Sequence, residues 1–152
     1  RALCNRSLIC AANNEKSVVA LNSIIKKREK FRPLAPVMLR PVAELWFEVN
    51  QKAIDCYRWM ALTAVARENL PIEYEPILHF DRTARIQILD DETHPIYDFL
   101  VRNRGKIDML VNTSFNVGGD PIVFDAFDCY VNMKRLGVNR MITETGLYSC
   151  KP

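Results

Sequence analysis

The hydrophobic positions of this 152-residue chain form short runs and alternating stretches that are separated by polar, capping and turn residues. Continuous apolar runs indicate buried strands, alternation indicates a half-buried strand, and apolar residues three or four positions apart indicate helices. On this basis strands are expected over 7–12, 57–66, 108–112, 139–144 and 147–151, and an extended segment over 34–40. Helices are expected over 41–49, 94–104 and 125–136, and a further one has its apolar positions at Val18, Leu21 and Ile25.

Capping residues mark where several predicted helices begin. Asn13 or Asn14 can accept a hydrogen bond from the first turn of the helix that follows, and this helix must end before Pro33. Pro41 and Asp125 favour helix starts at their own positions. The stretch 57–66 fits a strand or a helix, and we interpret it as a strand.

The segment 83–89 alternates in polarity, which predicts a half-open hairpin strand. One face carries Ala84, Ile86 and Ile88, and the other carries Thr83, Arg85, Gln87 and Leu89. A solvated strand face is the usual explanation for Arg85 and Gln87, unless that face lies against the other candidate segments.

Strands mixed with helices, without an internal repeat or a linker, predict one domain of the α/β (α+β) class on a twisted mixed β-sheet. Hydrophobic residues make up 49% of the chain and charged residues 26%, which is typical of a globular protein. No apolar stretch approaches the roughly 18 residues that span a bilayer, so a soluble protein is expected. Because the chain starts at Arg1 rather than Met, we expect a segment of a longer protein.

Positive charge is concentrated in one segment. The 21 Lys and Arg against 18 Asp and Glu give a net charge of +3, too little to indicate nucleic-acid or membrane binding. Residues 26–32 alone contain five positive charges and one negative charge. The five cysteines are odd in number and never spaced C-x-x-C, which fits neither a disulfide framework nor a zinc site and makes the reducing cytoplasm the expected location.

The cationic segment KKREKFRP, residues 26–33, combines an expected helix end with a proline-stiffened loop. Cations in a last helical turn complement the helix dipole and are usually solvated, which accounts for Lys26 and Lys27. Arg32 lies between Phe31 and Pro33, beyond the expected helix end, where a fixed guanidinium beside lysines suits phosphate or carboxylate groups.

The segment NTSFNVGGDP, residues 112–121, directly follows the apolar run 109–111. Small polar side chains and two glycines at the C-terminal end of a buried strand stand where open sheets bind ligands, although any tight turn needs the same residues. Ser114 and Asn116 are two residues apart, so in an extended segment they point to the same side.

Common catalytic motifs do not occur in the sequence. Without a G-x-x-x-x-G-K-[ST] phosphate loop or a G-x-G-x-x-G fingerprint, nucleotide binding would use side-chain cations and a strand-end loop. The two histidines, His79 and His94, have no metal-ligand spacing with other residues, and no metal ligands are assigned. No serine stands in a G-x-S-x-G elbow.

Four segments in a fixed order form a specific combination: RALCNRS at 1–7, K-x-R-E-x-F-R-P-x-A-P at 26–36, D-x-T-A-R-I-Q at 81–87, and NTSFN at 112–116 with PIV at 121–123. Together they resemble the C-terminal, YrdC-like domain of the O-carbamoyltransferases of nodulation and antibiotic tailoring. The resemblance covers nearly the whole chain, 1–152. It implies a YrdC-like twisted sheet with flanking helices and a concave ligand face.

The resemblance also implies a function. The domain would bind ATP and carbamoyl phosphate, with Mg²⁺ on the nucleotide phosphates, and would form a carbamoyl-adenylate. A separate N-terminal metal-binding domain of the actin-like superfamily, which would hold any iron or other metal and is missing from this chain, would transfer the carbamoyl group to an acceptor hydroxyl. Neither a membrane nor a nucleic acid is an expected partner.

Residue roles follow from the match to the family's K-x-R and S-x-N motifs. The implied nucleotide and phosphate ligands are Lys26, Arg28, Ser114 and Asn116, with Arg6, Arg32 and Arg85 as additional contacts. Lys26, Arg28 and Arg85 are the implied catalytic residues, because fixed cations offset the repulsion between phosphates and stabilise charge that develops on leaving groups.

The sequence departs from the family pattern at four positions. Cys4 and Arg82 stand where glycine is usual, and a positive φ is expected at the turn that contains Arg82. Lys30 replaces a common proline, and Asp120 replaces a glutamate. These changes affect loop geometry and substrate preference more than they affect the phosphate ligands.

Two alternatives remain open from the sequence. A threonylcarbamoyl-adenylate synthase shares the fold and the two short motifs, but the segments 1–7 and 31–36 favour the O-carbamoyltransferases. A noncatalytic RNA-binding module would need only cations and aromatic residues, so the presence of both Ser114 and Asn116 speaks against it.

Overall fold

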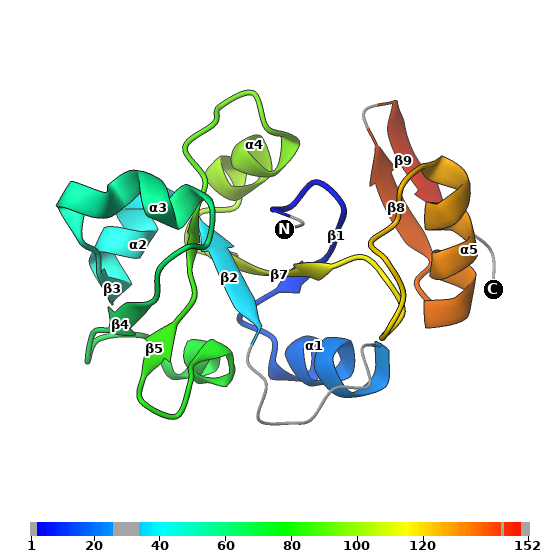
Figure 1. The fold of residues 1–152 in the computed structure, drawn as a ribbon. Coiled ribbons are helices and arrows are strands. Elements are labelled where there is room, and N and C mark those ends of the chain that lie inside the picture. Colours follow the sequence, from blue (N-terminus) through cyan, green and yellow to red (C-terminus); the bar gives the residue numbers. More distant parts are fainter. Residues whose placement is uncertain (1–2, 26–33, 144, 150–152) are drawn as a thin grey trace.

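The structure is a computed structural model that describes residues 3–25, 34–143 and 145–149 (Figure 1). Its strands are β1 (Ser7–Ala11), β2 (Ala35–Met38), β3 (Phe47–Glu48), β4 (Ala64–Ala66), β5 (Thr83–Ala84), β6 (Gln87–Ile88), β7 (Met109–Ser114), β8 (Arg140–Thr143) and β9 (Gly146–Ser149). Its helices are α1 (Glu15–Val19), the π-helix η1 (Ala20–Ile25), α2 (Arg40–Trp46), the 3₁₀ helix η2 (Gln51–Ala53), α3 (Ile54–Arg58), the 3₁₀ helix η3 (Ile72–Ile77), α4 (Pro95–Arg102) and α5 (Ala126–Leu136).

A four-stranded mixed sheet in the order β1-β7-β2-β6 organises the fold. Strand β7 pairs antiparallel with β1 and β2, and β2 pairs parallel with β6. Ser114, the last residue of β7, therefore lies opposite Ser7, the first residue of β1. We call the edge where β7 ends and β1, β2 and β6 begin the loop edge, and the opposite edge, where β2 and β6 end, the clamp edge.

Helices cover both faces of this sheet, with α1 and α4 on opposite sides of β2 and β7 in Figure 1. Successive β7 side chains point to opposite faces, so Val111 joins the larger buried cluster with Val18 of α1. Leu110 joins a smaller buried cluster with Leu100 of α4. Burial on both faces explains why β7 begins with a continuous apolar run rather than an alternating one.

Smaller elements flank the central sheet. Strands β3, β4 and β5 form a second, three-stranded sheet, and β8 and β9 form a hairpin that lies beside α5 (Figure 1). Within the described ranges, no helix has the length and apolar character needed to cross a membrane.

The predicted mixed α/β architecture and several of its helix starts are confirmed. Asn14 caps α1 by accepting a hydrogen bond from Ser17 N, and Asp125 caps α5 by accepting one from Asp128 N. Helix α2 begins at Arg40, with the proline that favours a helix start in its first turn, and ends at Trp46.

The interpretation of 57–66 as a strand is wrong for most of the segment. Its first two residues belong to α3, and only Ala64–Ala66 form β4. Between these elements Met60 is buried with a φ of 50°. The apolar run is a helix end, a turn and a short strand in succession, which periodicity over so few residues does not separate.

The predicted half-open hairpin strand at 83–89 is also wrong. The chain changes sheets there, because β5 pairs with β4 whereas β6 pairs with β2. Arg85, between the two strands, is exposed, but Gln87 and Leu89 are buried in place of the solvated face that alternation predicted.

Candidate functional site

Ser114 and Asn116 contact each other at the loop edge, where β7 ends. Ser114 Oγ donates a hydrogen bond to Asn116 Oδ1 over 2.7 Å, so the two side chains lie on the same side of the chain. Asn116 Nδ2 in turn donates to the carbonyl oxygen of Asp120 over 2.7 Å. These bonds fix the start of the loop that leaves the sheet.

Arg6 lies at the base of this loop. Phe115 N donates to Arg6 O over 3.0 Å, which continues the β1–β7 ladder, and Val123 N donates to Phe115 O over 3.0 Å, which closes the loop. The exposed Arg6 side chain donates from Nη1 to Val123 O over 3.2 Å. Within the described part of the chain, its guanidinium forms no ion pair, so its charge is available to an anion at the loop edge.

The far side of the loop is attached to α5. Arg135 Nη1 pairs with Asp120 Oδ2 at 2.6 Å, and Asn132 Oδ1 accepts a hydrogen bond of 3.4 Å from Val117 N. Gly119 turns the loop with a φ of 91°, a conformation that a residue with a Cβ rarely adopts. The loop is therefore held between the sheet and α5.

The other site residues predicted from sequence fall into two groups. Arg85 is exposed just before β6 begins, at the same loop edge as Arg6 but at the far side of the sheet from β1. The cationic residues Lys26, Arg28 and Arg32 lie outside the described residues. The structure thus brings Ser114 and Asn116 into contact and places the backbone of Arg6 beside Phe115, which lies between them in the chain.

Sequence reasoning missed an amide pair beneath the loop edge. Asn112 Nδ2 donates to Gln87 Oε1 over 2.8 Å, and each side chain is 3% exposed. The sequence held one signal, because Gln87 lies between two isoleucines and the structure buries all three residues. The alternating pattern nevertheless assigned Gln87 to a solvated face. Only the tertiary partner on β7 explains why a polar side chain is buried at this position.

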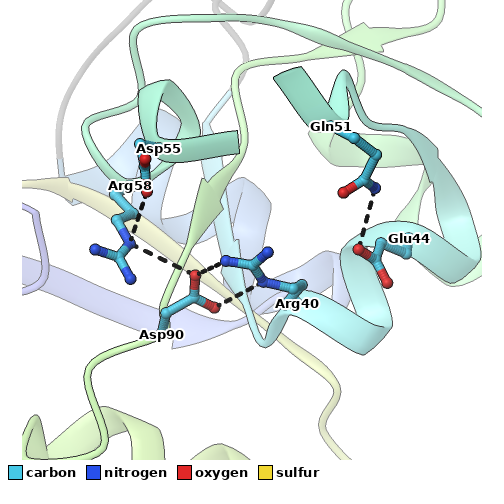
Figure 2. A network of polar contacts seen from close by, with 6 residues as sticks. All are labelled: Arg40, Glu44, Gln51, Asp55, Arg58 and Asp90. Carbon is cyan, nitrogen blue, oxygen red and sulfur yellow. Dashed lines mark hydrogen bonds and ion pairs between the residues drawn. The ribbon is translucent and has the colours of Figure 1, made fainter. Parts of the chain in front are cut away.

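A cluster of charged residues occupies the clamp edge. Figure 2 shows Asp90, which directly follows Leu89 at the end of β6, between the guanidinium groups of Arg40 and Arg58. Asp90 accepts from Arg40 Nη2 at 2.5 Å and from Arg40 Nε at 3.4 Å, and Arg58 Nε is 3.5 Å from Asp90 Oδ2. The hydrogen bond to Asp90 raises the pKa of Arg40 above its ordinary value. The cluster joins the first turn of α2 to the chain that leaves β6.

Burial changes the chemistry of two thiols near the sheet. Desolvation raises the pKa of Cys4 to about 12 and that of Cys10 to about 11, so both remain protonated and unreactive at neutral pH. The four described cysteines are free thiols. In the ranges that the structure describes, no three His, Cys, Asp or Glu side chains are grouped to hold a metal ion.

The two residues that stand where the family usually has glycine, Cys4 and Arg82, have the backbone conformation that glycine favours. Cys4 has a φ of 63° and Arg82 a φ of 60°, which confirms the positive φ expected at the turn. Leu3, beside Cys4, has a φ of 49°. Left-handed backbone at a residue with a Cβ costs about 1–2 kcal/mol, so the segment before β1 stores conformational strain.

Comparison with known proteins identifies relatives of the whole chain. Residues 1–149 match the family described as carbamoyltransferase C-terminus. The chain is 28% identical to the nodulation protein NolO of Bradyrhizobium diazoefficiens over 100% of its own length and 28% of that protein's length. It is 30% identical to the 3'-hydroxymethylcephem-O-carbamoyltransferase of Amycolatopsis lactamdurans over 93% of this chain and 26% of that enzyme. The chain thus spans about a quarter of the length of these relatives.

A solved structure shares the fold. Full-length HypF, crystallised in a phosphate- and nucleotide-bound form, aligns with a TM-score of 0.64 and 20% identity over 86% of this chain and 17% of HypF. The YrdC-like fold class expected from the sequence is confirmed by this match.

Proposed function

Because the chain belongs to the carbamoyltransferase C-terminus family, we propose that it binds ATP and carbamoyl phosphate and forms a carbamoyl-adenylate. In the full protein the carbamoyl group then passes to an acceptor hydroxyl, at a metal-binding actin-like domain that precedes this one. The cytoplasm is the proposed location. Atoms balance if one water is consumed: carbamoyl phosphate, ATP and water yield carbamoyl-adenylate, phosphate and pyrophosphate.

The contact between Ser114 and Asn116 carries this proposal. Their side chains share one side of the strand end, with Ser114 Oγ 2.7 Å from Asn116 Oδ1. The chain just before β1 supplies Arg6, whose guanidinium no described carboxylate neutralises. A hydroxyl and an amide beside a free cation suit phosphate oxygens, because bonds from neutral donors orient the group while the cation offsets its charge. Arg6, Ser114 and Asn116 are the proposed phosphate ligands at this edge.

Chain length supports a role for the cationic segment at the same edge. Arg32 precedes Ala35, the residue that begins β2, by three residues in the sequence. We propose that Arg32 binds phosphate there and that Lys26, Arg28 and Arg85 stabilise charge on the departing phosphate and pyrophosphate. Mg²⁺ on the nucleotide phosphates would keep mostly water and phosphate ligands and needs few protein carboxylates.

The test is a pyrophosphate-release assay on the Ser114→Ala, Asn116→Ala double variant. Wild type should release pyrophosphate only when ATP and carbamoyl phosphate are both present, whereas the double variant should lose this activity and keep its thermal melting temperature within a few degrees. An active double variant would remove these two residues from the site.

A matched control comes from the β8–β9 hairpin, which Figure 1 shows beside α5. There the hydroxyls of Thr143 and Thr145, also two residues apart, lie 2.9 Å from each other at a turn. The Thr143→Ala, Thr145→Ala variant removes the same kind of polar contact and should retain activity. We expect the 152-residue chain alone to yield no carbamoylated acceptor.

A further inference from the structure

Two buried amides on β6 and β7, the strands on either side of β2, are joined across one face of the sheet. Asn112 on β7 donates to Gln87 on β6, and both side chains are 97% buried. The strand between them contributes only apolar or backbone surface at this point, since Val37 lies opposite Gln87 and Ala35 opposite Asn112. The strand between the two amides therefore supplies no side-chain hydrogen bond to the pair.

The hydrogen bonding of this pair is incomplete. Within the described residues, Asn112 Oδ1 is fully buried and has no hydrogen-bond donor. Gln87 Nε2 has no acceptor in these residues either, although it is not one of the fully buried unpaired atoms. Ser7 Oγ, a diagonal neighbour of Asn112 across the β1–β7 ladder, is also buried without a partner. Buried amides in folded proteins are almost always satisfied, so these atoms indicate a missing polar group.

The unpaired atoms specify the chemistry of that group. Asn112 Oδ1 accepts a hydrogen bond and repels an anion, so a phosphate does not complete the site. A primary amide edge fits, because its NH₂ can donate to Asn112 Oδ1 while its carbonyl oxygen accepts from Gln87 Nε2. A carbamoyl group carries this edge, and adenine carries a related one at its amino group and ring nitrogen.

Position along the strand favours the carbamoyl group. Asn112 precedes Ser114 by two residues on the same face of β7, which separates their Cα atoms by roughly 6.6 Å. In carbamoyl phosphate the amide is bonded directly to a phosphate oxygen, so one small molecule can reach both residues. In ATP the ribose separates adenine from the phosphates and carries the base beyond Asn112.

We propose that Gln87 and Asn112 form the carbamoyl subsite, which recognises the NH₂ group of carbamoyl phosphate by hydrogen bonds. The phosphate of the same molecule then lies at Ser114 and Asn116. This inference rests on the proposed function. It assigns substrate selection to a neutral amide pair rather than to the cations of the loop edge.

The segment before β1 contacts the amide pair. Cys4 is buried, and its Sγ lies 3.7 Å from Gln87 Oε1. Leu3 and Cys4 both have left-handed backbone without being glycine, so the conformation that covers the amides is a strained one.

The test compares carbamoyl phosphate with acetyl phosphate, in which a methyl group replaces NH₂. Calorimetric titration of wild type should show that carbamoyl phosphate binds at least about tenfold more tightly, since acetyl phosphate leaves Asn112 Oδ1 unpaired. The Gln87→Met, Asn112→Leu double variant removes both amides together and leaves neither unpaired. It should bind the two phosphates within about twofold of each other, and both more weakly than wild type binds carbamoyl phosphate.

A neighbouring residue supplies the matched control. Thr113 is buried on the same strand but points to the opposite face from Asn112, so Thr113→Val should retain the preference for carbamoyl phosphate. If the double variant does not fold in a thermal melt, Gln87→Glu keeps an acceptor for Asn112 Nδ2 and removes the Nε2 donor. It should weaken carbamoyl and acetyl phosphate alike, because both carry the carbonyl oxygen, and unchanged affinities would remove Gln87 from the subsite.

The outcomes separate this inference from the proposed function. The subsite alone is overturned if wild type binds carbamoyl phosphate and ATP but does not prefer carbamoyl to acetyl phosphate. It is also overturned if the double variant folds and keeps that preference. A double variant that keeps this preference but no longer prefers ATP to GTP also overturns it, because the amides then read adenine. A wild type that binds neither ligand overturns the proposed function as well.

Discussion

The two edges of the four-stranded sheet hold polar clusters of opposite construction. At the clamp edge, Asp90 lies between Arg40 and Arg58, and each charge is matched by an opposite one (Figure 2). At the loop edge, Ser114 and Asn116 are neutral, and Arg6 is bonded to a carbonyl oxygen instead of a carboxylate. Paired charges stabilise a fold, whereas an unmatched cation beside neutral donors favours the binding of an anion.

The largest effect is expected from Arg6→Ala, which tests the loop edge. Removing a charged donor to phosphate should weaken carbamoyl phosphate binding by about 1.5–3 kcal/mol, while the lost bond to Val123 O changes stability by less than about 1 kcal/mol. Calorimetric titration and urea unfolding measure the two quantities. Arg6→Lys keeps the charge and should recover part of the affinity. An unchanged affinity in Arg6→Ala would show that the loop edge, like the clamp edge, does not bind the anion through Arg6.

Asp90→Ala is the reciprocal test at the clamp edge. It removes a carboxylate that is 14% exposed and leaves two guanidinium groups without their shared partner. The free energy of unfolding should fall by about 1.5–2 kcal/mol in urea titrations, with carbamoyl phosphate affinity unchanged within about twofold. An affinity loss as large as that of Arg6→Ala would mean that the clamp edge also binds ligand.

Alkaline pH should destabilise the protein through the buried thiols Cys4 and Cys10 while it leaves the charges of the clamp edge unchanged. Burial raises the pKa of Cys4 to about 12 and of Cys10 to about 11 from an ordinary value of 9.0, so the folded state keeps its protons where the unfolded state releases them. The resulting stabilisation is complete below pH 9 and declines by roughly 1 kcal/mol per pH unit and thiol as the pH rises above it. The pKa of Arg40 is raised, so the clamp stays charged throughout.

Urea unfolding at pH 8 and pH 10.5 in the presence of a reductant measures this decline. Cys4→Gly, which suits the positive φ at that position, should have a shallower dependence on pH than wild type. Parallel pH profiles for the two proteins would show that Cys4 does not contribute.

The smallest effect concerns the attachment of the loop to α5. Arg135→Ala breaks an ion pair whose side chains are 50% and 40% exposed, so stability should fall by at most about 0.5 kcal/mol. Because the same pair holds Asp120, the affinity for carbamoyl phosphate should fall about three- to fivefold, or less than about 1 kcal/mol.

The control is Arg102→Ala, which breaks the exposed pair with Asp98 on α4 at 2.9 Å. It should cost as little stability as Arg135→Ala and leave affinity unchanged. Equal affinities for the two variants would show that the loop needs no support from α5.

Local signals in the sequence predicted much of the fold. The apolar run before Asn112 predicted β7, and the side chains of Asn14 and Asp125 predicted two helix starts, because a cap is formed within four residues. Arg82 stands where the family usually has glycine, and this predicted the left-handed backbone of its turn, which is again a local feature. Each of these features depends on neighbours along the chain.

Features that depend on distant partners could not be predicted in this way. The burial of Gln87 requires Asn112, which is 25 residues away and on a strand that is not its direct neighbour. The ion cluster at Asp90 draws its partners from two other elements. At the loop edge the side-by-side placement of Ser114 and Asn116 was predicted from strand geometry, whereas the position of Arg6 depended on the register of β1.

That register sets when the protein can first bind a ligand during its synthesis. Ser7 pairs with Ser114, so more than one hundred residues must leave the ribosome before β1 finds its partner. At about 5–20 residues per second, β1 spends several seconds as an unpaired, largely apolar strand that a chaperone can recognise. Arg6 and the loop that follows β7 come together only when this pairing forms, and ligand binding is therefore a late reporter of folding.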